Sequence, residues 1–484
     1  MAWPPTLPAA TDVLLQNAAV PVCLLDASAV LTAPDGEGLV RVDVAVRDGR
    51  IAGIAAHGVR RAAATTVTVP LDGTQVWPCF VDMHTHLDKG HIWPRADNAE
   101  GTFAGALASA GADRAARWQH DDIAARMAFG LRAAYAHGTA AIRTHLDSIS
   151  PQHRISWPLF AALRDEWQGR IALQAVSILL LEHWQGNAGD ELADCVAAHR
   201  GIIGAVVPPS ATLAAQLDRV FALAADRGLD LDFHADETGD PSAAALRAIA
   251  QATLRNRFAG RVTVGHCCSL AVQAADEVER TLDLVAAAKL AIVSLPMCNL
   301  FLQDRVSGRT PRWRGVTLLH ELRARGIAVA LASDNCRDPF YAYGDHDMLE
   351  VFRESARIAH LDRPVGSWPA AVTRTPAAIM NLVEHGTLRT GAPADAVLFN
   401  ARGYSELLSR PQFDRVVLRA GKAIDTALPD YRELDHLMSP VQMADKPRSS
   451  PRRREPGDTR RKALGSRPRP KRSGARFRGN DKVT

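Results

Sequence analysis

The sequence lacks the features of membrane-bound and disulfide-stabilised proteins. No apolar run approaches the ~20 residues that a membrane helix needs. The first residues, MAWPPTLPAATDVLLQ, contain no basic stretch followed by a long apolar one, as a secretory signal would. The seven cysteines form no C-x-x-C pair, and an odd number of scattered thiols is typical of a reducing compartment. We therefore expect a cytoplasmic protein without a membrane partner.

The sequence also lacks a basic folded part, although its formal net charge is +4. Residues 446–484 contain 15 Lys/Arg against 3 Asp/Glu, which leaves 42 basic and 50 acidic side chains in the rest of the chain. A protein that binds nucleic acid through its folded domain carries a basic surface there. We therefore expect no nucleic-acid partner, and we expect the apolar-poor segment 446–484 to be a basic disordered tail.

Apolar runs of strand length alternate with alanine-rich segments of helix length from residue 76 onward. Unbroken Val, Ile and Ala runs are typical of strands buried on both faces. Eight such strands alternating with helices predict an α/β fold of the (β/α)8 TIM barrel type. One of the helices is expected at 211–227 and should end at Gly228. The runs are 76–84, 139–147, 171–178, 201–209, 229–237, 261–268, 291–298 and 327–335.

Shorter strands separated by turn residues precede and follow this alternation. They include 12–18, 23–27, 41–56 and 66–73 before it, and 395–400 and 414–425 after it. We expect both chain ends to build one small β-sandwich domain. The predicted domains are the β-sandwich, formed by residues 1–75 and 386–435, the barrel, formed by residues 76–385, and the tail, residues 446–484.

Polar side chains end four of the eight runs. His84 and His86 end the first, His234 lies in the fifth, His266 in the sixth and Asp334 in the eighth. Catalytic groups of a parallel barrel gather at the C-terminal ends of its strands. Alternate residues of a strand face the same way, so His84 and His86 can both reach one ion.

Three histidines and an aspartate supply the nitrogen and oxygen ligands expected of Zn²⁺ or Fe²⁺, with a position left for water. Glu237 follows His234 closely enough to act on that water as a general base. The sequence therefore predicts one divalent metal ion per chain and a hydrolytic reaction.

Five segments resemble, in this order and spacing, the cytosine deaminase branch of the amidohydrolase superfamily: PCFVDMHTHLDK, RTHLD, DFHADE, VTVGH and ASDNCRDPF. The resemblance covers about residues 12 to 430. It implies that one metal ion is bound by four residues, His84, His86, His234 and Asp334. It also implies that Glu237 is the acid/base group and that His266 contacts the activated water. Binuclear relatives use a strand-4 lysine, which GIIGAVVPPS lacks.

The resemblance implies hydrolytic deamination of a small aminated nitrogen heterocycle, such as cytosine, isocytosine or a related pyrimidine, by a metal-activated water. The expected partners are that heterocycle and water, and a homo-oligomer is left open. Two alternatives remain: release of an alkylamine from a triazine ring, and a non-catalytic scaffold with the amidohydrolase fold.

The substrate-binding residues depart from the cytosine deaminase pattern. Leu180 occupies the position of the glutamine that recognises the ring edge in that family, and Asn335 and Phe340 replace an aspartate and a tryptophan. Phe103 is assigned to the same pocket. Because Leu180 offers no hydrogen bond, we expect cytosine not to be the best substrate, unless Gln174, Asn299 or a water replaces the glutamine.

Two further residues keep open alternatives. Lys89 is either a substrate contact or a solvated lid residue. His145 ends the second run and is expected to be structural rather than functional.

Overall fold

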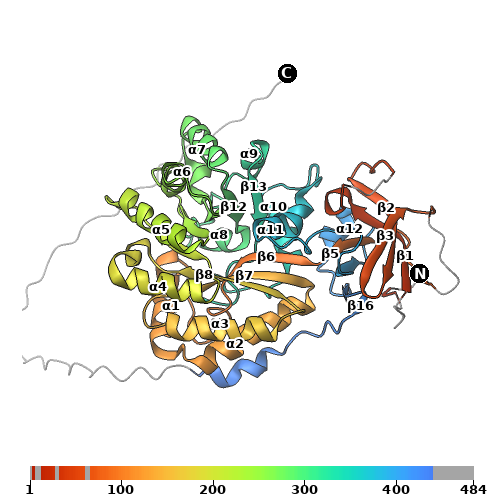
Figure 1. Ribbon diagram of the computed structural model, residues 1–484, viewed down its shortest axis with the longest axis horizontal. Coiled ribbons are helices and arrows are strands. Elements are labelled where there is room, and N and C mark those ends of the chain that lie inside the picture. Colours follow the sequence, from red (N-terminus) through yellow and green to blue (C-terminus); the bar gives the residue numbers. More distant parts are fainter. Residues whose placement is uncertain (1–2, 6–11, 28–31, 60–65, 440–484) are drawn as a thin grey trace, which may run out of the picture. The chain divides into compact units, whose positions relative to one another are not determined.

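Parallel strands alternating with helices form the larger part of the molecule in the computed structural model (Figure 1), which describes residues 3–5, 12–27, 32–59 and 66–439. The predicted tail at 446–484 lies outside these described residues. Within the described ranges, no helix has both the length and the apolar composition needed to cross a membrane.

All eight predicted barrel strands are present, and they pair in parallel in two sheets. One sheet has the order β6–β7–β8 and the other β13–β12–β11–β10–β9. Parallel bridges join the edges of the two sheets: Thr85 pairs with Asp334, Val176 with Ile202 and Leu180 with Val206. The bounds are β6 Phe80–Thr85, β7 Thr139–Asp147, β8 Ala172–Ile178, β9 Ile203–Val207, β10 Leu231–Ala235, β11 Val262–His266, β12 Ala291–Ser294 and β13 Ala328–Leu331.

Helices lie between these strands and pack their apolar faces against the sheets. The helix expected at 211–227 is α5, Leu213–Arg227, whose Leu217, Val220 and Phe221 are buried. It ends at Gly228, whose φ of 64° is the left-handed conformation that favours glycine. The other helices are α1 Phe103–Arg117, α2 His120–Ala136, α3 His153–Glu166, α4 Gly186–Ala198, α6 Ala245–Arg255, α7 Ala275–Ala287, α8 Pro296–Leu302, α9 Leu319–Ala324, α10 Met348–Ile358, α11 Arg374–Ile379 and α12 Tyr404–Ser409.

Strands from both chain ends form one eight-stranded sheet, as expected for that part of the chain. Its order is β16–β15–β14–β5–β1–β2–β3, and β4 pairs with β1. Red and blue strands therefore lie together in Figure 1. The second layer of a β-sandwich stays a prediction. The bounds are β1 Asp12–Pro21, β2 Leu39–Arg47, β3 Arg50–Ala56, β4 Val67–Pro70, β5 Gln75–Pro78, β14 Ala396–Phe399, β15 Val416–Arg419 and β16 Lys422–Ala423.

The strand expected at 23–27 is wrong. Val22–Leu24 forms a short 3₁₀ helix, η1, directly after Pro21. Proline has no N–H to donate and its φ is fixed, here at −57°, so β1 ends at this residue and the chain turns. Only Leu25 of the segment makes a bridge, to Leu388.

The run at 76–84 forms two strands rather than one. β5 pairs antiparallel with β14, whereas β6 pairs parallel with β7, and Cys79 separates them. Trp77 of β5 joins the two parts through edge contacts with Phe80, Phe352 and Phe399, at centroid distances of 6.2, 5.4 and 5.8 Å. The shared sheet therefore extends past residue 75 to Pro78.

Candidate metal centre and active site

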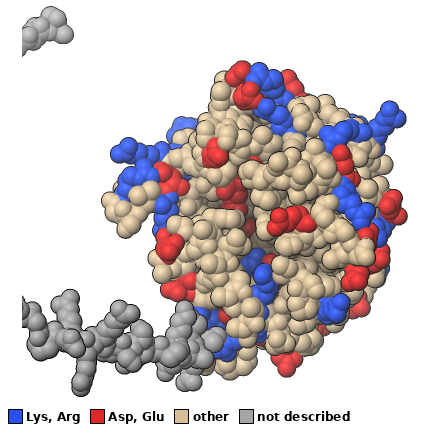
Figure 2. All heavy atoms as spheres, turned by 90° about the vertical axis from the view of Figure 1, so that its left-hand side faces the viewer, with Lys and Arg blue, Asp and Glu red and all other residues tan. Residues whose placement is uncertain are grey.

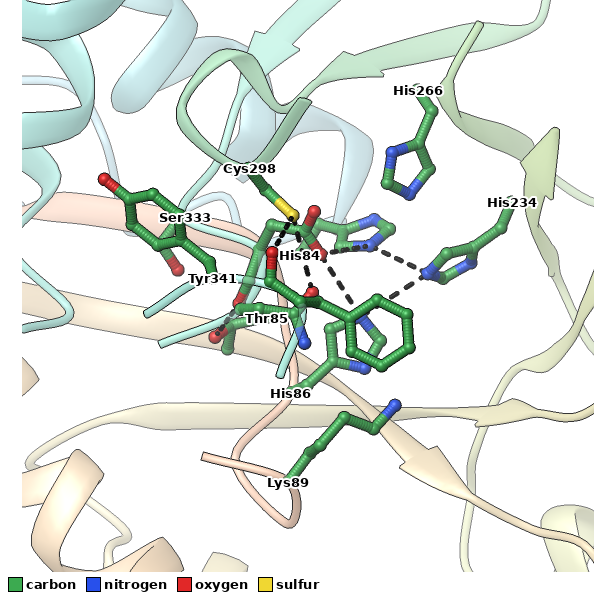
Figure 3. A network of polar contacts seen from close by, with 12 residues as sticks. His84, Thr85, His86, Lys89, His234, His266, Cys298, Ser333 and Tyr341 are labelled. Carbon is green, nitrogen blue, oxygen red and sulfur yellow. Dashed lines mark hydrogen bonds and ion pairs between the residues drawn. The ribbon is translucent and has the colours of Figure 1, made fainter. Parts of the chain in front are cut away.

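Four side chains from three parts of the chain converge on one point at the C-terminal ends of the strands. His84 Nε2 lies 3.1 Å from His234 Nε2, which lies 3.5 Å from His86 Nε2. Asp334 Oδ1 lies 3.6 Å from His84 Nε2 and 3.3 Å from His86 Nε2. Figure 3 shows the three imidazoles turned toward one another. These are the four residues that the sequence assigned to the metal.

The geometry and protonation of this cluster fit a divalent ion. Ligand atoms about 2.0–2.2 Å from a tetrahedral Zn²⁺ stand about 3.4 Å from one another, which matches the observed 3.1–3.6 Å. Burial lowers the pKa of His84, His86 and His234 well below the usual value, so the imidazoles are neutral, as ligands must be. Both carboxylate oxygens of Asp334 are buried without a hydrogen-bond donor. A cation at this point would satisfy them.

Glu237 and His266 lie beside this cluster and share one partner. Asn299 of α8 donates from Nδ2 to Glu237 Oε1 at 3.2 Å and to His266 Nδ1 at 3.0 Å. With Nδ1 accepting, the proton of the neutral His266 ring resides on Nε2, which has no protein partner. Burial and the nearby charge of Asp334 raise the pKa of Glu237 well above the usual value. Glu237 therefore holds a proton to higher pH than an ordinary carboxyl group does.

His145 is closer to the cluster than its expected structural role suggests. Its ring centroid lies 3.9 Å from that of His84 and 4.7 Å from that of His234. The side chain is fully buried, and neither ring nitrogen has a hydrogen-bond partner. The signal in the sequence was the polar end of the second run, RTHLD, which places this histidine at the same edge as the ligands.

A pocket of about 610 Å³ lies in front of the cluster. The face shown in Figure 2 is hollowed near its middle, with acidic and basic side chains around the hollow. All four residues assigned to substrate binding line the pocket: Leu180, Phe103, Asn335 and Phe340. Leu180 is 37% exposed, so it lies toward the open side of the pocket rather than in its interior.

One wall of the pocket is charged. Lys89 is 5% exposed, so it is not a solvated lid residue, and its Nζ lies 3.3 Å from Asp147 Oδ1. Arg114 NH1 donates to the other oxygen of Asp147 at 2.9 Å. Burial acts to lower the pKa of Lys89, but Asp147, Asp88 and Asp338 outweigh it and raise the pKa. Lys89 is therefore a cation facing the pocket, and its Nζ lies 5.2 Å from the centroid of the Phe340 ring.

Of the two side chains considered as replacements for the missing glutamine, Gln174 is engaged elsewhere. Its oxygen accepts from Arg143 at 3.0 Å and its nitrogen donates to Met380 O at 2.8 Å. The pocket instead contains Gln303, which directly follows α8 and donates to the backbone oxygen of Glu237 at 3.1 Å. Nothing in the sequence marks Gln303, because the direction of a side chain at the end of so short a helix depends on tertiary packing.

Comparison with known proteins gave one family match and several relatives. The model of the Amidohydrolase family matches residues 181–422. A pterin deaminase of Rhizobium rhizogenes is 52% identical over 429 residues, which cover 88% of this chain and 97% of that protein.

Two solved structures are also similar. The structure of 5-methylcytosine deaminase from Klebsiella pneumoniae liganded with 5-fluorocytosine has a TM-score of 0.72 at 23% identity, covering 87% of this chain and 98% of that one. The structure of N-isopropylammelide isopropylaminohydrolase from Burkholderia multivorans has a TM-score of 0.67 at 26% identity, covering 87% and 100%.

Proposed function

Because this chain belongs to the amidohydrolase family and is a hydrolase of carbon–nitrogen bonds, we propose that it hydrolytically deaminates a pterin. The observation that carries the proposal is the 52% identity to a pterin deaminase across 97% of that protein's length. Hydrolase membership sets aside the non-catalytic scaffold.

The proposed substrate has two fused rings, whereas the sequence led us to expect a single-ring pyrimidine. The amino-bearing ring of a pterin is a fused isocytosine ring. Isocytosine is one of the substrates that we expected because Leu180 replaces the glutamine of the cytosine deaminases. A pocket of about 610 Å³ lies within the range of small-molecule sites and leaves room beyond one ring.

The proposed reaction replaces one bond at the amino-bearing carbon. A water oxygen forms a bond to that carbon, and the bond from the carbon to the amino nitrogen breaks. One proton of the water stays on a ring nitrogen, and the other leaves with the amine as ammonia. The product carries a carbonyl where the amine was. The divalent ion, when bound by His84, His86, His234 and Asp334, supplies the Lewis acidity that makes a water nucleophilic at neutral pH.

Glu237 is the proton carrier in this proposal. Its carboxylate takes a proton from the attacking water and delivers it to a ring nitrogen, which makes the neighbouring carbon electrophilic. It then transfers a proton to the leaving amine. The raised pKa of Glu237 supports both roles, because a carboxylate that is more basic than usual takes a proton from water more readily, and the resulting carboxylic acid can then release that proton to the substrate.

His266 and Asn299 position the reacting groups. The N–H of His266 at Nε2 is free to donate to the oxygen that becomes attached to the ring carbon. Asn299 fixes both this ring and the Glu237 carboxyl group by donating to each of them. Lys89 and Arg114, which Asp147 holds in the pocket wall, supply donors for the polar substituents of a pterin.

The test is a comparison of kcat/KM for ammonia release from pterin, isocytosine and cytosine, with release of isopropylamine from N-isopropylammelide as a fourth arm. We expect pterin to exceed cytosine by about tenfold to hundredfold or more, since each buried polar group without a partner costs ~1–3 kcal/mol. A preference for cytosine, or turnover of the triazine alone, would overturn the pterin assignment.

Three finer features remain part of the proposal. We infer that the eight parallel strands close into a barrel, supported by the bridges at Thr85, Val176 and Leu180 that link both edges of the two sheets. We also infer a single ion in the pocket, as Zn²⁺ or Fe²⁺. The cytoplasmic location and a homo-oligomeric state stay predictions.

A further inference from the structure

A second group of metal-ligating side chains lies outside the pocket. It consists of His91, Cys336 and His346, and each offers a ligand atom within 4.8 Å of the other two. Each residue is only 2% exposed. None of them lines the pocket, and none belongs to the set that binds the first ion.

The backbone brings the three residues together. His91 lies in the loop after β6, whereas Cys336 and His346 lie between β13 and α10. His91 N donates to Cys336 O at 3.0 Å, and Trp93 N donates to Arg337 O at 2.8 Å. The two loops are therefore already hydrogen-bonded at the point where the side chains meet.

Within the described residues, the imidazoles of this group make no hydrogen bonds through their ring nitrogens. Both ring nitrogens of His91 and both of His346 are buried without a hydrogen-bond partner. Buried polar groups in proteins are nearly always paired, so two such rings side by side call for a ligand. The rings are 5.6 Å apart between centroids, and Cys336 forms no disulfide.

Helix α2 makes room for this arrangement at Gly130. A Cβ atom at this position would lie 2.9 Å from His346 Nε2, which is too close. Glycine is unfavourable inside a helix, so its presence here is explained by the close approach of the imidazole.

We propose that His91, Cys336 and His346 bind a Zn²⁺ ion that ties the loop after β6 to the loop after β13. Two nitrogens and one sulfur form a ligand set that suits Zn²⁺, and three protein ligands leave one position for water. Because Asp334 lies two residues before Cys336, this ion braces the loop that carries a ligand of the pocket metal.

The protonation of the two imidazoles agrees with metal binding. Burial lowers the pKa of His91 well below the usual value and that of His346 to about 4, so both rings are neutral ligands.

The test is metal analysis of the full chain loaded with Zn²⁺ or Co²⁺. We expect two metal equivalents per chain and, for cobalt, a sulfur-to-metal charge-transfer band in the near ultraviolet. The ligands assigned to the pocket ion contain no sulfur, so this band reports the second site. X-ray absorption of the zinc form should show one sulfur at about 2.3 Å.

The variants separate this site from the pocket and from general effects on folding. The metal content of Cys336→Ser should fall from two equivalents per chain to one, and this variant should lose the charge-transfer band. Cys79 is also 2% exposed but lies between β5 and β6, so Cys79→Ser should keep both metal equivalents and the band. His234→Ala should keep the band while losing the pocket ion. One equivalent in the wild type without a sulfur signal, or a band that survives in Cys336→Ser, would overturn the proposal. If Cys336→Ser does not fold, the wild-type stoichiometry and absorption spectrum decide.

Discussion

Replacing Glu237 by glutamine should abolish turnover while leaving fold and metal binding intact. The amide retains the shape of the side chain, and its oxygen can still accept the 3.2 Å hydrogen bond from Asn299. The 3.1 Å bond from Gln303 goes to the backbone oxygen and does not depend on the side chain. Removing the carboxyl group also removes its repulsion with Asp334, so the affinity for the metal should not fall.

The loss of rate follows from the number of proton transfers. General acid–base catalysis contributes about 10²–10⁴ per group, and Glu237 serves both the ring nitrogen and the leaving amine. We therefore expect kcat to fall more than about 10⁴-fold, which raises the barrier by over ~5 kcal/mol. An amide cannot shuttle protons, so no compensation by its N–H groups is expected.

The assay is ammonia release from pterin under saturating substrate, together with metal content and melting temperature for each protein. Glu182→Gln makes the same chemical change at an exposed position after β8 and should leave all three values near those of the wild type. Residual activity of Glu237→Gln within tenfold of the wild type would remove this residue from the mechanism. Loss of the metal would show that it acts on binding instead.

Three further predictions concern metal, specificity and acid stability. His234→Ala should lose the pocket ion and all activity, by elemental analysis and ammonia assay; an intact ion would contradict the ligand assignment. Leu180→Gln should improve kcat/KM for cytosine relative to isocytosine, and an unchanged ratio would exclude Leu180 from recognition. Asp347→Asn should reduce the free energy of unfolding in urea at pH 7 by about 3 kcal/mol. Burial raises the pKa of Asp347, but Arg415 and His137 outweigh burial and lower the pKa to about 2, against about 3.9 in the unfolded chain. Since the folded pKa is the lower one, this contribution is complete above pH ~4 and disappears as pH falls to about 2; an equal difference at pH 2 and pH 7 would contradict the assignment.

The sequence predicted the eight parallel strands well because their local signal matches their environment. Strands such as 139–147 and 231–235 are buried along their whole length, and an unbroken apolar run is what such burial requires. The convergence of the residues that we assign to the metal was predictable for the same reason. His84, His234 and Asp334 are polar groups at the ends of apolar runs, where parallel strands bring their carboxyl ends to one edge.

The remaining features depend on partners that a single run of residues does not reveal. The run 76–84 is uniformly apolar, and nothing in it marks Cys79 as the point where the chain changes sheets. Asn299 lies in α8 and Gln303 directly follows this helix, and the packing of the helix decides where both side chains point. His91 and His346 are more than 250 residues apart in sequence, and only the fold shows that they meet Cys336 in one buried group.

The passage of the chain from β5 to β6 has a consequence for dissecting or transplanting this protein. Four residues, Gln75–Pro78, belong to the sheet of the chain ends, and the next strand begins at Phe80 and carries His84. A fragment of residues 76–385 would keep Trp77 but lose β14, which would leave the edge of β5 without its partner and expose the face of Trp77 that Phe399 contacts. The catalytic unit is therefore not portable as residues 76–385, and any transfer to another scaffold must include the strands from both ends of the chain.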